Sequence, residues 1–165
     1  MKHAAISFLE TPVGTLKIIG DAEAVRWVAF TDEPPRSTDG KVPTVVRTCK
    51  YQLDEYFKGK RTSFDVAIDP GGTAFQKKVW SHLQQIPFGK TSTYVEIAEK
   101  MGSSNKTRAI GLANGKNPMA ILIPCHRIIG SNGSLTGYAW GLDKKEWLLK
   151  HEHAIPGFQQ LNLFK

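Results

Sequence analysis

The stretch TRAIGLANGKNPMAILIPCHRIIG, residues 107–130, decides the fold of the second half of this chain. It opens with a short run rich in Gly and Ala after the turn SSNK (103–106), a pattern that predicts the second helix of a helix-turn-helix. Pro118 stops that helix, because proline cannot continue it. The apolar run AILIP (120–124) then predicts a buried, extended segment that leads into a polar turn at Cys125.

Helical patterns precede this stretch. Thr93 and Glu96, three residues apart, have the spacing of a capping box. This spacing predicts that the first helix of the helix-turn-helix begins after Thr93, and Gly102 is predicted to end that helix. Further upstream, apolar residues at helical spacing predict another helix with one buried face (Phe75, Val79, Leu83 and Ile86). The chain from Thr73 onward is therefore predicted to be mostly helical.

Short strands dominate the pattern before Thr73. Three segments rich in β-branched and aromatic residues predict strands: AAISFLE (4–10), TLKIIG (15–20) and AVRWVAF (24–30). The charged, proline-containing stretch 31–41 predicts an exposed loop. A helix is predicted to begin at Pro43 and to bury one apolar stripe (Val46, Cys49, Leu53 and Phe57), and FDVAI (64–68) predicts a last short strand.

The net positive charge of the chain lies entirely in its second part. DPGGT (69–73) predicts a boundary between two domains, residues 1–72 and 73–165. The first holds 10 Lys+Arg and 10 Asp+Glu, and the second holds the other 12 basic and 5 acidic residues, so the second carries all of the formal net charge of +7. Such a distribution is typical of a phosphate-binding surface, although a generally soluble basic face explains it equally well.

Length and composition exclude several classes of protein. With 165 residues, 41% of them hydrophobic and 22% charged, the chain lies in the globular range. No apolar run approaches the roughly 20 residues of a membrane-spanning helix, and the N-terminal residues lack a signal-peptide pattern. Two cysteines provide neither a disulfide scaffold nor a four-ligand zinc site. We therefore expect a cytoplasmic protein, nuclear in a eukaryote, with no membrane partner.

Cys125 is the strongest candidate for chemistry. It follows Pro124 and precedes His126 and Arg127, at the one place where Cys, His and Arg adjoin. Cationic neighbours favour the thiolate, which is the reactive form, whereas the alternative is a buried cysteine acting as a small hydrophobic residue. Because neighbours in sequence need not face each other, the sequence is compatible with a direct hydrogen bond between Cys125 and His126 and also with a water that bridges them. Cys49 lies on the apolar stripe of its helix and is expected to be core.

Glu152 is the second informative position. LDKKEWLLKHE predicts a last helix to about His151, with Asp143 as its N-cap. Glu152 lies three and four residues after Leu149 and Leu148, so it continues the apolar face of that helix. A carboxylate there either reaches solvent or meets a buried partner. A histidine partner would make chemical sense, because a carboxylate can orient an imidazole as a general base.

The residues of the predicted helix-turn-helix favour close contact with a backbone or a narrow groove. Arg108 is followed by small residues (Ala109, Gly111, Ala113 and Gly115), whereas a major-groove reader would present Asn, Gln, Arg and Lys at successive positions. Helix–helix packing explains the same small residues. Arg108 could contact phosphate, a base edge or solvent, and Tyr94 could be core, a hydrogen-bond donor or a stacking platform. Asn117 is by default a turn residue.

IPCHRIIG, with TRAIGLANGKNP before it and LTGYAWG after it, closely resembles the O6-alkylguanine-DNA alkyltransferases, the methylated-DNA–protein-cysteine methyltransferase family. The resemblance runs from about Thr73 to Glu152 and is looser before that, in TPVG and EYF. It implies an α/β (α+β) fold, with a small RNase H-like N-terminal domain packed on a mostly helical C-terminal domain that contains a winged-helix-like helix-turn-helix.

The resemblance also implies an activity. The family transfers the alkyl group of O6-alkylguanine in double-stranded DNA to its own cysteine, once and irreversibly, after flipping the damaged nucleotide out of the duplex through the minor groove. The resemblance does not decide whether O4-alkylthymine is a second substrate. On this resemblance Cys125 is the acceptor, His126 deprotonates the thiol through a water, Glu152 orients the imidazole, and Asn117 braces the active-site turn.

Further residues are implied to contact substrate or DNA. Tyr94 would donate to the minor-groove edge of guanine, and Arg108 would replace the extruded base. The carbonyls of Cys125 and Ile128 would accept from the guanine amino group, and the Ala139 N–H would bond the base oxygen. The whole implied set is Tyr94, Arg108, Ala109, Arg127, Ile128, Tyr138, Ala139 and Trp140.

The family resemblance implies a monomer that needs no metal and no organic cofactor. Trp140 stands where many relatives have glycine, and the hypothesis is that its indole narrows the pocket and favours small alkyl groups. Two other classes compete with this interpretation. One is a DNA-binding protein without chemistry, such as a regulator or an alkyltransferase-like damage sensor, and the other is a hydrolase that uses a thiolate.

Overall fold

The computed structural model describes residues 4–36 and 40–155, and it folds into two compact units. The first unit runs to Gly71 and also contains Pro118–Leu122, while the second takes Gly72–Asn117 and continues from Ile123. No local pattern indicated that Pro118–Leu122 would join the first unit. The outer ends of the two predicted domains, residues 1–3 and 156–165, lie outside the described residues.

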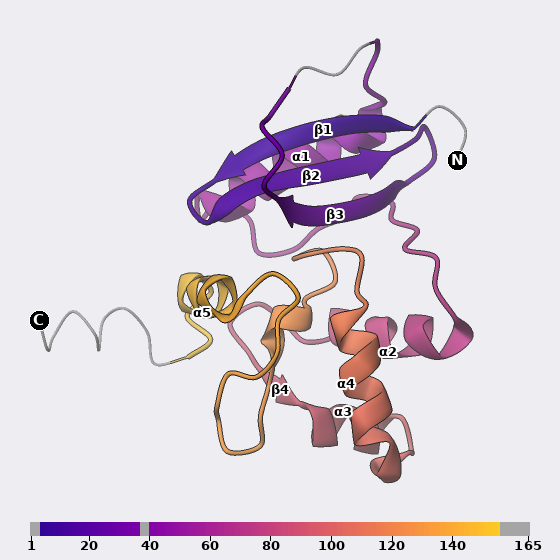
Figure 1. Cartoon of the computed structure of the whole chain (residues 1–165), viewed down its shortest axis with the longest axis vertical. Helices are drawn as coiled ribbons and strands as arrows, with labels where there is room; N and C mark the ends of the chain where they lie inside the picture. The colour runs from indigo at the N-terminus through magenta and orange to yellow at the C-terminus, as the bar shows by residue number, and fades with distance from the viewer. Residues whose placement is uncertain (1–3, 37–39, 156–165) are drawn as a thin grey trace, which may run out of the picture. The chain divides into compact units, whose positions relative to one another are not determined.

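The first unit is built on an antiparallel sheet in the order β1-β2-β3 (Figure 1). All three predicted strands are confirmed, as β1 (Ala5–Thr11), β2 (Gly14–Gly20) and β3 (Val25–Thr31). Leu9 pairs with Leu16, which in turn pairs with Phe30, so one register aligns apolar residues across the sheet. Gly14 has φ 129°, a backbone conformation that side chains disfavour and that the turn between β1 and β2 requires.

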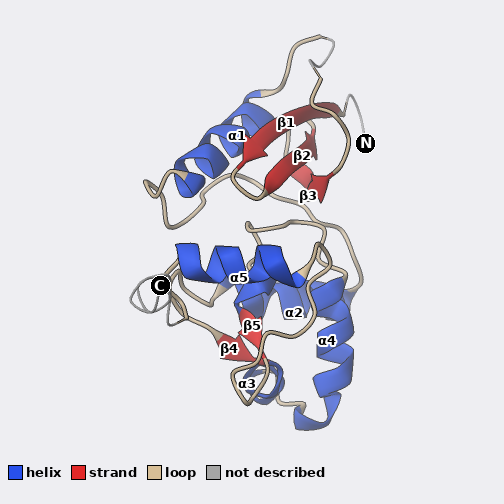
Figure 2. Cartoon of the chain, turned by 60° about the vertical axis from the view of Figure 1, so that its left-hand side comes forward, coloured by secondary structure: helices blue, strands red, loops and turns tan. Residues whose placement is uncertain are grey.

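Helix α1 (Thr44–Phe57) lies along one face of this sheet (Figures 1 and 2). It starts after Pro43 as predicted, and Val46, Cys49 and Leu53 are fully buried. The predicted end of the stripe is wrong, because Tyr56 is buried and Phe57 is only half-buried. Each fully buried Leu or Val stabilises the fold by about 1.5–3 kcal/mol.

Two segments, FDVAI (64–68) and AILIP (120–124), were predicted to be extended. Each of them pairs with β3 only locally. FDVAI does not form a strand, and its contact is an isolated parallel bridge between Ile68 and Val25. The second segment bonds to Val28 of β3. The Val28 N–H donates to the Pro118 carbonyl at 2.9 Å, and the Ala120 N–H donates to the Val28 carbonyl at 2.8 Å. These bonds explain why Pro118–Leu122 belongs to the first unit.

The segment AILIP is buried as predicted but turns instead of extending. Ile121 adopts φ 71°, in a region that a β-branched residue rarely enters. The surrounding burial holds this conformation, because Ile121 and Ile123 are each 1% exposed. The chain thus reverses just before Cys125.

The second unit surrounds a short parallel pair of strands with helices (Figure 2). Its elements are α2 (Ala74–Gln84), β4 (Ser92–Thr93), α3 (Tyr94–Lys100), α4 (Thr107–Gly115), β5 (Ile128–Ile129) and α5 (Leu142–His151). Short 3-10 helices at Ser104–Lys106 and Cys125–Arg127 complete it. The turn at Ser104–Lys106 connects α3 and α4, so the predicted helix-turn-helix is present, and the mixed α/β fold class is confirmed.

The helix starts differ in part from their sequence patterns. The Thr93 hydroxyl accepts from the Glu96 N–H at 3.1 Å, as expected of an N-cap. The predicted N-cap Asp143 is wrong, because Gly141 caps α5 with φ 108° and Asp143 lies in the first turn. A Cβ on Gly141 would approach the Asp143 carboxylate to 2.7 Å, which explains why glycine stands there. No helix in the described ranges is long and apolar enough to cross a membrane.

Candidate active site

Cys125 is held at the entrance of a 3-10 turn inside the second unit. The Asn117 side chain donates from Nδ2 to the Ile123 carbonyl at 2.8 Å, which ties the end of α4 to the residues just before the cysteine. The Ile128 N–H donates to the Cys125 carbonyl and closes the turn. Asn117 is 4% exposed and Cys125 3%, so both the brace and the thiol are buried.

The thiol borders a cavity of about 130 Å³. Its walls come from the start of α3, the second half of α4, the 3-10 turn and the loop before α5. The lining residues are Tyr94, Gly111, Asn114, Gly115, Cys125, Gly137, Tyr138 and Ala139. An engineered cavity of about 150 Å³ holds a benzene molecule, so this volume suits part of an aromatic ring system. Tyr94, Tyr138 and Ala139 were expected to contact substrate, and the structure brings them together here.

His126, Arg127 and Glu152 form a buried cluster that begins at the residue after Cys125. His126 Nε2 lies 2.8 Å from Glu152 Oε2, so the partner predicted for the carboxylate is present. Arg127 Nε donates to Glu152 Oε1 at 2.8 Å, and its Nη1 donates to the Ile86 carbonyl at 2.6 Å. His126 is 0% and Glu152 1% exposed, so these contacts are shielded from water.

The cluster leaves one nitrogen of His126 available. Burial lowers the pKa of His126 below its usual value, although Glu152 opposes this, so the ring is neutral at neutral pH. Its Nε2 faces the Glu152 carboxylate and carries the proton, because a carboxylate only accepts. Nδ1 then has a free lone pair, and it is buried without a hydrogen-bond partner in the described residues.

Glu152 stays ionised in spite of its burial. Burial alone would raise the pKa of its carboxyl, but His126 and Arg127 outweigh this and hold the pKa well below its usual range. The carboxylate therefore fixes the orientation of the imidazole and stabilises any positive charge that the ring acquires.

Cys125 is a thiol at rest, contrary to the expectation that His126 and Arg127 favour the thiolate. Burial raises the pKa of Cys125 to about 11, and the groups that oppose this are Asn117 and Lys145. Arg127 does not act on the sulfur in this way, because Glu152 and the Ile86 carbonyl engage its guanidinium. Cys49 is core as predicted, with no exposed surface and a pKa raised to about 12 by burial.

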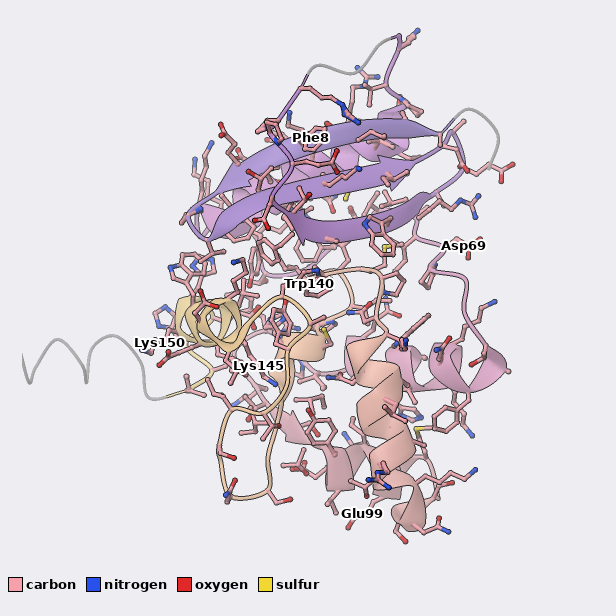
Figure 3. All side chains as sticks on the ribbon, in the orientation of Figure 1. Phe8, Asp69, Glu99, Trp140, Lys145 and Lys150 are labelled. Carbon is pink, nitrogen blue, oxygen red and sulfur yellow. The ribbon has the colours of Figure 1, made fainter. Side chains whose placement is uncertain are left out.

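Lys145 is a functional candidate that the sequence patterns did not single out. It lies on α5 with no exposed surface, and its Nζ donates to the Thr136 carbonyl at 2.6 Å and the Gly137 carbonyl at 3.2 Å (Figure 3). Burial lowers the pKa of Lys145 to about 8, while the sulfur of Cys125 raises it. Its position three residues before Leu148, on the apolar face of α5, was the signal in the sequence.

The other predicted contact residues are not among those that line the cavity. Arg108 and Ala109 lie at the start of α4, where Arg108 is exposed. Trp140 packs edge-on against Tyr138 with ring centroids 5.2 Å apart, at the edge of the loop that lines the cavity (Figure 3). Ile128 is fully buried in β5.

Arg127 requires a correction. It was expected to contact substrate or DNA, but it is 6% exposed and its guanidinium is engaged within the second unit. The Tyr138 hydroxyl is buried without a partner in the described residues, and burial raises its pKa well above its usual value, so it stays a donor. In the described part of the chain, no group of three or more His, Cys, Asp or Glu side chains could hold a metal ion.

Comparison with known proteins places this combination of fold and site in a family. The profile of the 6-O-methylguanine DNA methyltransferase DNA-binding domain matches residues 74–154, and that of the ribonuclease-like domain of the same enzyme matches residues 5–70. A methylated-DNA–protein-cysteine methyltransferase from Methanosarcina acetivorans is 47% identical over 150 residues, covering 88% of this chain and 96% of that protein. One from Mycobacterium tuberculosis is 43% identical over 147 residues, covering 87% and 89%.

Solved structures agree with the sequence comparison. The crystal structure of Mycobacterium tuberculosis O6-methylguanine methyltransferase superposes with a TM-score of 0.81 at 36% identity, covering 98% of this chain and 99% of that one. A structure of the mycobacterial protein in complex with DNA gives a TM-score of 0.80 at 39% identity, covering 96% and 98%. These likenesses define an α/β methyltransferase with a DNA-binding domain. The chain belongs to the 6-O-methylguanine DNA methyltransferase family.

Proposed function

We propose that this protein repairs DNA by transferring the alkyl group of O6-alkylguanine to the sulfur of its own Cys125. The observation that carries the proposal is a buried thiol on the wall of a cavity, followed in the chain by a neutral imidazole whose Nε2 is fixed by Glu152. The family membership supports the substrate, since the relatives are named methylated-DNA–protein-cysteine methyltransferases.

The first step is proton removal from the thiol. With a pKa of about 11, Cys125 is protonated at neutral pH and therefore needs a base. His126 Nδ1 takes this proton through a water, and the imidazolium that results is stabilised by the Glu152 carboxylate 2.8 Å from Nε2. Lys145 adds a buried positive charge that favours the thiolate.

The second step is an in-line displacement. The Cys125 sulfur forms a bond to the alkyl carbon as the bond from that carbon to O6 breaks, and the electron pair of that bond moves onto the guanine. Tyr94 and Tyr138 line the cavity with Cys125, and both carry hydroxyl donors that can neutralise charge developing on the base. The product is a thioether with no easy reversal, so each molecule acts once and needs neither a metal nor an organic cofactor.

DNA binding delivers the base to this cavity. The alkylated oxygen is not accessible to a buried thiol while the base is stacked, so the nucleotide must leave the duplex at a cost of a few kcal/mol. Arg108, exposed at the start of α4, occupies the gap that the base leaves. Basic residues of the second domain supply salt-sensitive contacts to phosphate, consistent with their net charge of +7.

The proposal extends to the organisation and location of the protein. The boundary between residues 1–72 and 73–165 separates the ribonuclease-like domain from the domain that binds DNA and accepts the alkyl group. The protein acts as a monomer on double-stranded DNA in a reducing compartment, the cytoplasm or, in a eukaryote, the nucleus. The indole of Trp140 narrows the pocket edge and favours methyl over bulkier groups.

Single-turnover repair of duplex DNA with one O6-methylguanine tests the proposal. The wild-type protein restores guanine, whereas Cys125→Ser abolishes repair and keeps duplex binding, and Cys49→Ser repairs at the wild-type rate. Tight binding by the wild-type protein without repair would contradict transfer and favour a damage sensor. Hydrolysis of an ester substrate that depends on Cys125, without repair, would favour a thiolate hydrolase.

A further inference from the structure

Thr136 joins two parts of the cavity wall through its side chain. It lies in the loop before α5, directly before residues 137–139, which line the cavity. Its Oγ1 donates to the hydroxyl oxygen of Tyr94 at 3.4 Å. Tyr94 is the first residue of α3, and it also lines the cavity. The loop and helix α3 therefore meet through this pair of hydroxyl groups.

The backbone of Thr136 is held at the same time by a buried charge. The ammonium of Lys145 donates to the Thr136 carbonyl at 2.6 Å and to the Gly137 carbonyl at 3.2 Å (Figure 3). Lys145 has no exposed surface, and hydrogen bonds from a charged donor are the stronger ones. Lys145 thus anchors the loop, and the Thr136 hydroxyl is presented to Tyr94 from a fixed position.

The direction of the hydrogen bond matters for the chemistry of Tyr94. A phenol has one proton to donate and two lone pairs that can accept. Because Thr136 donates to the phenol oxygen, the Tyr94 proton stays available for an acceptor in the cavity. A hydroxyl group that accepts a hydrogen bond is polarised by it and becomes a stronger donor. Negative charge develops on the guanine as the bond from O6 to the alkyl carbon breaks, and a stronger donor stabilises that charge.

We propose that Thr136 is a positioning residue for alkyl transfer, and that it acts through Tyr94. Its hydroxyl holds the phenol so that the Tyr94 proton is directed to the base, and it strengthens that donor while the leaving group becomes negative. The inference rests on the proposed function and adds to it a residue that the transfer step needs only through Tyr94. Its loss slows transfer and leaves duplex binding unchanged.

A double-mutant cycle with Tyr94 tests this assignment. Thr136→Val removes the hydroxyl and keeps the branched shape, while Tyr94→Phe removes the group through which Thr136 acts. Single-turnover transfer from a duplex with O6-methylguanine is measured with saturating protein for the wild type, both single variants and the double variant, with slow reactions followed for hours. We expect Thr136→Val to slow transfer by about fivefold, as the loss of one neutral hydrogen bond does. In the Tyr94→Phe background it has no further effect.

Two further variants separate the hydroxyl of Thr136 from the shape of the loop. Thr136→Ser keeps a hydroxyl on the same atom of the side chain and restores most of the wild-type rate. Ser134→Ala is the matched control, because it removes another hydroxyl of the same loop, one that donates to Asn132 Oδ1 at 2.7 Å. This variant transfers at the wild-type rate. Binding of undamaged duplex is the same in Thr136→Val as in the wild type.

The outcomes of the cycle are distinct. Equal slowing by Thr136→Val with Tyr94 and with Phe at that position would overturn the positioning role, because it indicates a general change in the loop. A wild-type rate in Thr136→Val, or in Tyr94→Phe, would overturn it as well. No transfer by the wild-type protein would instead overturn the proposed function.

Discussion

At the scale of single residues, three buried groups of the site are held in different protonation states. The Cys125 thiol is kept protonated by burial, the His126 imidazole is kept neutral by burial, and Glu152 is kept ionised by its contacts with His126 and Arg127. A proton moved from sulfur to His126 produces a thiolate next to Lys145 and an imidazolium next to Glu152. Each new charge therefore forms beside a group of opposite sign.

These protonation states predict a specific pH dependence of the single-turnover rate of alkyl transfer. Transfer of a proton from Cys125 to His126 does not change the total number of protons, so the rate is constant through neutral pH. It falls at acid pH, as His126 becomes protonated at a pKa below 6.5. A direct measurement of rate against pH checks this, and a rise of about tenfold per pH unit through neutrality would contradict it, because that slope indicates a thiolate formed without the base.

Lys145 gives a second prediction at this scale. Lys145→Met keeps the length of the side chain and removes the charge that lowers the Cys125 pKa. We expect the thiol pKa to rise by about one unit and the rate to fall by about tenfold, as titration of the thiolate absorbance and single-turnover repair would show. Lys144→Met is the neighbouring control and keeps both values. An unchanged thiol pKa in Lys145→Met would remove the charge of Lys145 from the mechanism.

At the scale of elements, helix α4 would connect the DNA contact proposed for Arg108 to the groups around Cys125. Arg108 lies at its exposed start, Asn114 lines the cavity near its end, and Asn117 just beyond it braces the turn that carries Cys125. A single rigid helix thus joins the residue expected to enter the duplex to the residues around the sulfur.

Arg108→Ala separates base extrusion from alkyl transfer. The variant lacks the side chain that fills the gap in the duplex, so repair of duplex DNA slows by about tenfold, a change in barrier of about 1.4 kcal/mol. Reaction with free O6-methylguanine base stays at the wild-type rate, because no base has to be extruded. Equal losses on duplex and free base would contradict the role of Arg108.

Local patterns predicted most elements, and the failures have physical causes. The strands, α1 and the helix-turn-helix follow from periodicity, and the Glu152–His126 contact follows from a carboxylate on an apolar helix face. The turn at Ile121, with its φ of 71°, depends on burial against distant parts of the chain and has no local signal. Lys145 was missed because a lysine is rarely fully buried, although its position on α5 indicated it.

At the scale of the whole molecule, the residues proposed for proton transfer belong to a buried ion cluster that also stabilises the fold. Glu152 on α5 bonds both His126 and Arg127, and Arg127 in turn bonds the carbonyl of Ile86 after α2. Three segments far apart in sequence are therefore joined, two of them by the Glu152 carboxylate and the third through the Arg127 guanidinium. Removal of a partner from such a buried pair costs about 3–5 kcal/mol, because a charge is left uncompensated.

Glu152→Gln should therefore lower stability in a pH-dependent way. The pKa of Glu152 is lowered on folding, so its contribution is present above the ordinary value of 4.5 and is lost as pH falls below it. We expect a destabilisation of about 3 kcal/mol at neutral pH that shrinks as the solution is made more acid than 4.5. Denaturant unfolding at several pH values measures it, and a difference that is independent of pH would contradict this account.

The central claim is that Cys125 accepts one alkyl group and keeps it. Peptide mapping by mass spectrometry, after incubation with an excess of duplex DNA carrying O6-methylguanine, measures both the position and the amount of alkylation. The account predicts one methyl group per protein molecule, on Cys125 and not on Cys49, with repair stopping at one equivalent of DNA. Repair of several equivalents of DNA per protein molecule, or repair that leaves Cys125 unmodified, would contradict it.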